Sequence, residues 1–67
     1  MQIILNNRPA HFEGEKITVN ELIKRKNFTF KLLVTKINGK LVRVDERDNA
    51  WISEGDKVEV MHLISGG

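Results

Sequence analysis

Hydrophobic and polar residues alternate along the first part of the chain, as they do in a half-buried β-strand. Ile3 and Leu5 lie on one side of residues 1–6, because successive side chains of a strand point to opposite faces. Residues 6–9 read Asn-Asn-Arg-Pro, a cluster of turn formers. The alternation resumes over residues 10–13. The pattern therefore predicts an N-terminal hairpin with its turn at residues 6–9.

The apolar spacing then changes to three and four, which is the spacing of a helix. After a break at residues 14–16, Thr18 is suited to cap a helix N-terminus, and Glu21 three residues later completes a capping box. Asn27 is a suitable end for this helix. A helix of about three turns is not stable without packing against other elements. The apolar stripe that we expect to face a sheet contains Val19, Leu22 and Ile23.

The second half of the chain predicts another hairpin and a last strand. Residues 32–37 are rich in β-forming side chains, Asn38-Gly39 follows, and residues 41–44 continue as the returning strand. Asn-Gly between two β-rich runs is a strong hairpin signal. After a polar, turn-like segment, we expect the last strand over residues 58–64.

These elements predict an α+β protein with the β-grasp fold. One main helix packed on one face of a mixed sheet of about four or five strands buries both apolar surfaces in two layers. In this fold the last strand pairs with the first and lies centrally. We expect a β-grasp domain over residues 1–64 and a flexible C-terminal tail over residues 65–67. The predicted core includes Ile3, Leu5, Leu22, Ile37, Val58 and Val60.

The composition excludes several classes of site. The 67 residues include no cysteine, which excludes disulfides, zinc–thiolate sites and thiol nucleophiles. The net charge is only +2, and the one basic run, at residues 24–26, is typical of a solvated helix end. No apolar run approaches the roughly 20 residues of a membrane span, and the first residues lack a signal-peptide pattern. We therefore expect a cytoplasmic protein with no nucleic-acid or membrane partner.

The remaining polar residues do not predict a catalytic centre. His11 and His62 are the only histidines and are far apart in sequence, so no metal site is expected. Asp45, Glu46 and Asp48 are typical of a solvated loop rather than a catalytic carboxylate pair. A chain of this length has little room for an enclosed active site.

The sequence ends Ser65-Gly66-Gly67, directly after the last predicted strand. One interpretation is a frayed end without a function. The other is a reactive tail, in which ATP adenylates the Gly67 carboxylate and a sulfur nucleophile converts it to a thiocarboxylate. Glycine has no Cβ, so Gly66 and Gly67 can thread a narrow channel beside a nucleotide. Three extended residues reach about 10 Å, which is enough to enter such a channel.

The alternation of side chains in the last predicted strand indicates an exposed apolar surface beside this tail. If Val58 and Val60 face the core, Met61 and Leu63 point outward. Two exposed apolar residues next to a reactive tail predict a docking patch for a partner. The alternative is that a bulge or a barrel-like sheet buries both residues.

The chain also carries a family resemblance, strongest over its second half. Its motifs are Ile37-Asn38-Gly39, then Val42, then Ile52-Ser53-Glu54-Gly55-Asp56-Lys57-Val58-Glu59-Val60, and finally Ile64-Ser65-Gly66-Gly67. They resemble the ThiS family within the ThiS/MoaD group of ubiquitin-like proteins. That family typically shows an aliphatic-Asn-Gly turn, an L-x-x-G-D-x-V stretch and a terminal Gly-Gly. The short length favours ThiS over MoaD.

The resemblance implies a sulfur carrier whose Gly67 is adenylated and converted to a thiocarboxylate that donates sulfur for the thiazole of thiamine. The implied partners are an E1-like adenylating enzyme, a sulfur donor such as a cysteine desulfurase, and thiazole synthase. The carrier is then a protein co-substrate rather than an enzyme, with no bound cofactor. A molybdopterin-type or other thiocarboxylate carrier, a ubiquitin-like modifier, and a plain interaction module with an inert tail are the alternatives.

Overall fold

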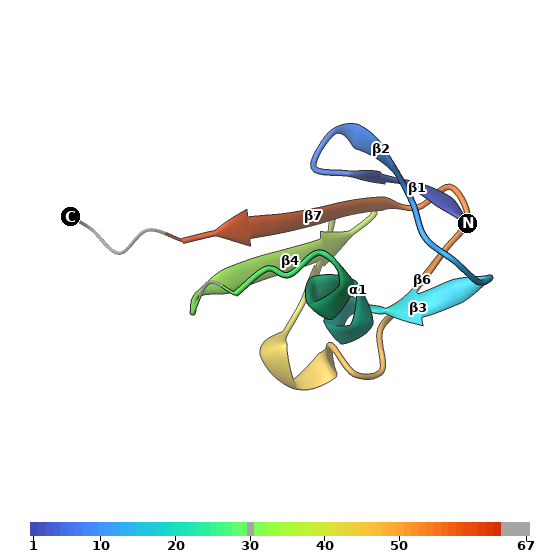
Figure 1. The fold of residues 1–67 in the computed structure, drawn as a ribbon. Coiled ribbons are helices and arrows are strands. Elements are labelled where there is room, and N and C mark those ends of the chain that lie inside the picture. Colours follow the sequence, from blue (N-terminus) through green and yellow to red (C-terminus); the bar gives the residue numbers. More distant parts are fainter. Residues whose placement is uncertain (30, 64–67) are drawn as a thin grey trace.

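A five-stranded mixed sheet with one α-helix packed on one face forms the body of the protein (Figure 1). The structure is a computed structural model that describes residues 1–29 and 31–63. β1 and β7 run parallel, and the other neighbouring strands of this sheet are antiparallel. The predicted β-grasp fold is confirmed, because the last strand lies centrally beside the first. Across the sheet the strands are β2 (Arg8–His11), β1 (Gln2–Leu5), β7 (Lys57–His62), β4 (Leu33–Ile37) and β5 (Lys40–Val42).

The N-terminal hairpin is confirmed, with a tighter turn than expected. Only Asn6 and Asn7 form the turn, with φ of 50° and 67°. Asparagine tolerates this left-handed region better than most residues. As a result β2 begins at Arg8, directly opposite Leu5, and Pro9 lies within this edge strand, where its missing N–H disrupts no ladder.

The helix α1 (Val19–Arg25) begins where the sequence predicts. The Thr18 hydroxyl accepts a hydrogen bond from the Glu21 backbone N–H at 3.1 Å, which caps the first turn. Val19 and Leu22 are fully buried, and Ile23 is half-buried against the core. The buried apolar residues are Ile3, Leu5, Phe12, Ile17, Val19, Leu22, Val42, Ile52, Val58 and Val60.

The β4–β5 hairpin turns at Asn38 and Gly39, with φ of 50° and 83°, as the Asn-Gly signal predicts. Two expectations about this region are wrong. Val44 does not continue the returning strand but begins a short 3-10 helix, η1 (Val44–Glu46), and is 73% exposed. The Glu46 carboxylate accepts a hydrogen bond from the Arg43 backbone N–H at 3.0 Å, which favours this turn over an extended chain. Ile37, expected in the core, is only half-buried because it lies at the strand end beside the turn.

A second, two-stranded sheet was not predicted. β3 (Lys16–Thr18) pairs antiparallel with β6 (Trp51–Ser53), so the expected break at residues 14–16 ends in a strand. The buried side chains of Ile17 and Ile52 lie opposite each other in this pair. Three-residue strands are too short to show a periodicity in the sequence. β3 and β6 are strands because they pair with each other and bury Ile17 and Ile52.

Candidate docking face and the root of the C-terminal tail

The described chain leaves the sheet at the end of its central strand. Figure 1 shows β7 between β1 and β4, running toward the C-terminal end of the protein. The predicted tail residues Ser65, Gly66 and Gly67 lie outside the described residues. The structure therefore shows the root of the tail, up to Leu63, and the surface that surrounds it.

Met61 and Leu63 both face solvent, as the parity of the strand predicts. Val58 and Val60 are 0% and 7% exposed, whereas Met61 is 38% and Leu63 is 51% exposed. The alternative in which a bulge or a closed sheet buries Met61 and Leu63 is therefore wrong. Their contact with a partner stays a prediction.

Further apolar side chains extend this exposed surface along β4 and β5. Met61 is paired with Val34 across the β4–β7 ladder. The Leu63 backbone N–H donates to the Leu32 carbonyl at 3.0 Å, and Leu32 is 53% exposed. Leu41 of β5 is 61% exposed. We call Leu32, Val34, Leu41, Met61 and Leu63 the apolar patch.

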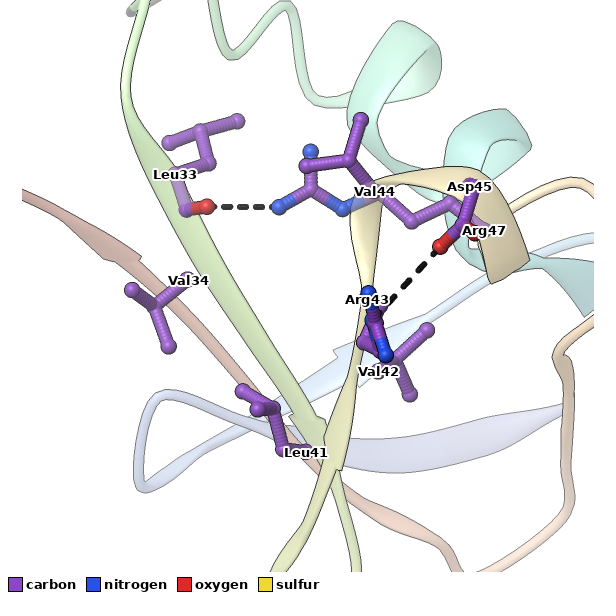
Figure 2. Close-up of a pocket in the computed structure, with 8 residues that line it drawn as sticks. All are labelled: Leu33, Val34, Leu41, Val42, Arg43, Val44, Asp45 and Arg47. Carbon is purple, nitrogen blue, oxygen red and sulfur yellow. Dashed lines mark hydrogen bonds and ion pairs between the residues drawn. The ribbon is translucent and has the colours of Figure 1, made fainter.

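An open groove of about 460 Å³ adjoins the apolar patch beside β4, β5 and η1 (Figure 2). Val34 and Leu41 belong to both features. Arg43 and Asp45 form an exposed ion pair of 3.8 Å beside the groove. Because most of the lining is aliphatic, the groove suits an apolar side chain of a protein partner. It is lined by Leu33, Val34, Leu41, Val42, Arg43, Val44, Asp45 and Arg47.

Arg47 is a buried cation that sequence reasoning missed. It is 8% exposed, and its guanidinium donates to the Thr35 hydroxyl at 3.2 Å. It also donates to the Leu33 carbonyl, as Figure 2 shows. Thr35 is fully buried, and its hydroxyl donates to the Val42 carbonyl at 2.8 Å. These bonds fix the beginning of β4, which pairs with the end of β7. In the sequence Arg47 stands in a run of charged residues, where nothing distinguishes it from a solvated side chain.

The other polar candidates do not gather into a site: the two histidines are exposed, and one of the acidic residues makes a structural hydrogen bond. His11 and His62 are both exposed. Asp48 accepts a hydrogen bond from the Asn20 side chain at 2.6 Å, which ties the loop after η1 to the helix. Within residues 1–29 and 31–63, no group of three or more His, Cys, Asp or Glu side chains is arranged to hold a metal ion. No helix in this part of the chain is long and apolar enough to cross a membrane.

Comparisons with known proteins agree with this architecture. Among protein-family models, the ThiS family matches residues 3–67. The crystal structure of the thiamine biosynthesis protein ThiS from Geobacter metallireducens has a TM-score of 0.89 at 25% identity, with 100% of both chains covered. The solution structure of a thiamine biosynthesis protein from the same organism has a TM-score of 0.80 at 25% identity, covering 100% of this chain and 88% of that one. A search of curated proteins gave no match.

A mixed sheet with its last strand in the centre and one helix across one face defines a β-grasp protein. The family match covers nearly the whole chain, and the solved structures share its architecture throughout. The chain belongs to the ThiS family, and its role is that of a small sulfur carrier in thiamine biosynthesis.

Proposed function

We propose that the carboxylate of Gly67 is the group that carries sulfur. An adenylating enzyme transfers AMP from ATP to this carboxylate and releases pyrophosphate. The persulfide of a sulfur donor then displaces AMP and forms an acyl disulfide. A second thiol cleaves this acyl disulfide, which releases the Gly67 thiocarboxylate and leaves a disulfide between the donor and that thiol. The thiocarboxylate donates its sulfur for the thiazole of thiamine. The observation that carries the proposal is the family match, which extends to Gly67 itself.

In this proposal the chain supplies a carboxylate and a way to deliver it, while its partners supply the catalytic groups. Ser65 and Gly66 thread the channel of the adenylating enzyme, because a residue without a Cβ at the penultimate position avoids clashes there. The open, mostly aliphatic groove beside the apolar patch is consistent with this division of roles, because it suits contact with a partner. In this proposal the protein acts as a co-substrate and has no resident cofactor.

The apolar patch is the surface on which we expect the adenylating enzyme to dock. Met61 and Leu63 are among the last three described residues before the tail, so a partner that covers them also meets the tail root. Exposed apolar residues clustered in this way mark interaction sites more often than solitary ones do. Thiazole synthase and a sulfur donor such as a cysteine desulfurase are the other expected partners. We also expect the protein to act in the cytoplasm.

Intact-protein mass spectrometry tests this proposal. The purified chain is incubated with its cognate adenylating enzyme, ATP, a cysteine desulfurase with cysteine, and a thiol reductant, and a parallel reaction omits ATP. The expected result is the mass increase that corresponds to one oxygen replaced by sulfur, only in the complete reaction, with fragment ions that locate it at Gly67. Covalent attachment to lysines would instead indicate a ubiquitin-like modifier, and an unchanged mass would contradict the proposal.

A further inference from the structure

The C-terminal half of β7 has a strand neighbour on one side only, among the described residues. β4 pairs with β7 from Val58 to His62, whereas β1 pairs with it only at Lys57 and Val58. β1 stops there because the chain turns back into β2 directly after Leu5. The backbone of β7 beyond Val58 therefore needs other partners on the side of β1.

The side-chain amide of Asn6 supplies these partners at Val60. The Val60 backbone N–H donates to Asn6 Oδ1 at 2.9 Å, and Asn6 Nδ2 donates to the Val60 carbonyl at 3.2 Å. The preceding bond of the ladder is an ordinary backbone bond, from the Asn6 N–H to the Val58 carbonyl at 2.9 Å. The amide thus takes the place of the next peptide group of β1 and extends the β1–β7 ladder after the strand itself has ended.

An asparagine also holds the beginning of the same strand. The Lys57 backbone N–H donates to Asn38 Oδ1 at 2.9 Å, and the Asn38 backbone N–H donates to the Lys57 carbonyl at 2.7 Å. Asn6 and Asn38 both lie in hairpin turns at left-handed φ, so each serves as a turn residue and as a partner of β7. Asn6 is the one near the root of the tail.

We propose that Asn6 is a positioning residue, which holds β7 at Val60 and so sets the direction in which the strand presents the Gly67 carboxylate. This inference rests on the proposed function of Gly67. Gly67 lies seven positions after Val60 in the sequence, a distance of at most about 23–25 Å along a chain. A shift of the strand at Val60 also shifts residues 61–63, from which the chain continues to Gly67, and a misplacement of about 1 Å at a reacting group can cost about a hundredfold in rate. Without the Asn6 amide, the end of β7 takes up more orientations. Fewer of these orientations lead the C-terminal tail into the channel of the adenylating enzyme.

The test compares Asn6→Gly with the matched control Asn7→Gly. The two asparagines are neighbours in one turn, are exposed and have positive φ, so both substitutions relieve the same backbone strain. Of these two turn residues, Asn6 is the one whose side chain bonds to β7. The measurements are ATP–pyrophosphate exchange with the cognate adenylating enzyme, at a temperature where each variant is folded, and amide hydrogen exchange at Val60.

In Asn6→Gly we expect kcat to fall by about tenfold to a hundredfold, with little change in KM because the apolar patch is intact. Exchange at the Val60 amide should accelerate by about tenfold, and Asn7→Gly should resemble the wild type in both. A purely structural role would lower the melting temperature and leave kcat unaltered. Equal kcat values for the two variants would overturn the inference about Asn6 and leave the proposed function intact. A wild-type chain that supports no ATP–pyrophosphate exchange would overturn the proposed function and the inference with it.

Discussion

Leu22 is the α1 side chain whose truncation tests most directly how the helix is attached to the sheet. It is fully buried in the same cluster as Ile3 and Val58 of the two central strands. Replacing a buried leucine by alanine costs about 2.7–5.0 kcal/mol, from lost transfer free energy and from the cavity that remains. A domain of 67 residues is expected to have a free energy of unfolding of only about 3–10 kcal/mol. Leu22→Ala should therefore remove a large part of the stability.

Leu41→Ala is the matched control, because it deletes the same atoms from a side chain that is 61% exposed. Surface substitutions usually change stability by less than about 0.5 kcal/mol. Urea denaturation followed by circular dichroism gives both free energies. For a domain of this size, each kcal/mol corresponds to about 4–8 °C in melting temperature, so Leu22→Ala should melt more than about 10 °C lower. If the two variants differ by less than about 0.5 kcal/mol, Leu22 does not attach the helix to the core as described.

Two further predictions concern the docking surface and the helix cap. Met61→Glu and Leu63→Glu should each weaken binding of the adenylating enzyme, as measured by isothermal titration calorimetry, while the melting temperature stays nearly unchanged because both side chains are exposed; a large loss of stability would contradict a docking role. Thr18→Ala should cost about 1 kcal/mol in urea denaturation because it removes the acceptor of the Glu21 N–H, whereas Thr18→Ser should keep most of that stability. Equal free energies of unfolding for the two Thr18 variants would show that the cap contributes nothing.

The parts of the fold that depend on local chemistry could be predicted from the sequence. Asn38-Gly39 specifies a hairpin because both positions require positive φ. Thr18 specifies the start of the helix because its hydroxyl satisfies a backbone N–H within the same turn. The outward direction of Met61 follows from the alternation of side chains in β7 once Val58 and Val60 are assigned to the core.

The parts that depend on distant partners could not be predicted in this way. β3 and β6 are three residues each and are defined by pairing between segments that lie far apart in the sequence, such as Lys16 with Ser53. Arg47 is buried because a hydroxyl and a carbonyl of β4 receive its guanidinium, and no local pattern distinguishes it from its charged neighbours. The Asn6 turn is visible in the sequence, but its bond to Val60 joins opposite ends of the chain.

The carboxylate of Gly67 is the centre of the account, and deleting Gly67 tests it most directly. Deletion moves the terminal carboxylate back by about 3.3–3.6 Å along an extended chain, which is far more than reaction geometry tolerates. The deletion leaves the buried cluster between Ile3 and Val60 unchanged, so we expect the melting temperature to stay nearly the same. The measurement is ATP–pyrophosphate exchange by the cognate adenylating enzyme, with the intact and the shortened chain at equal concentration. The account predicts exchange with the intact chain and none above background with the shortened one. Equal exchange rates would show that the terminal carboxylate is not the reactive group.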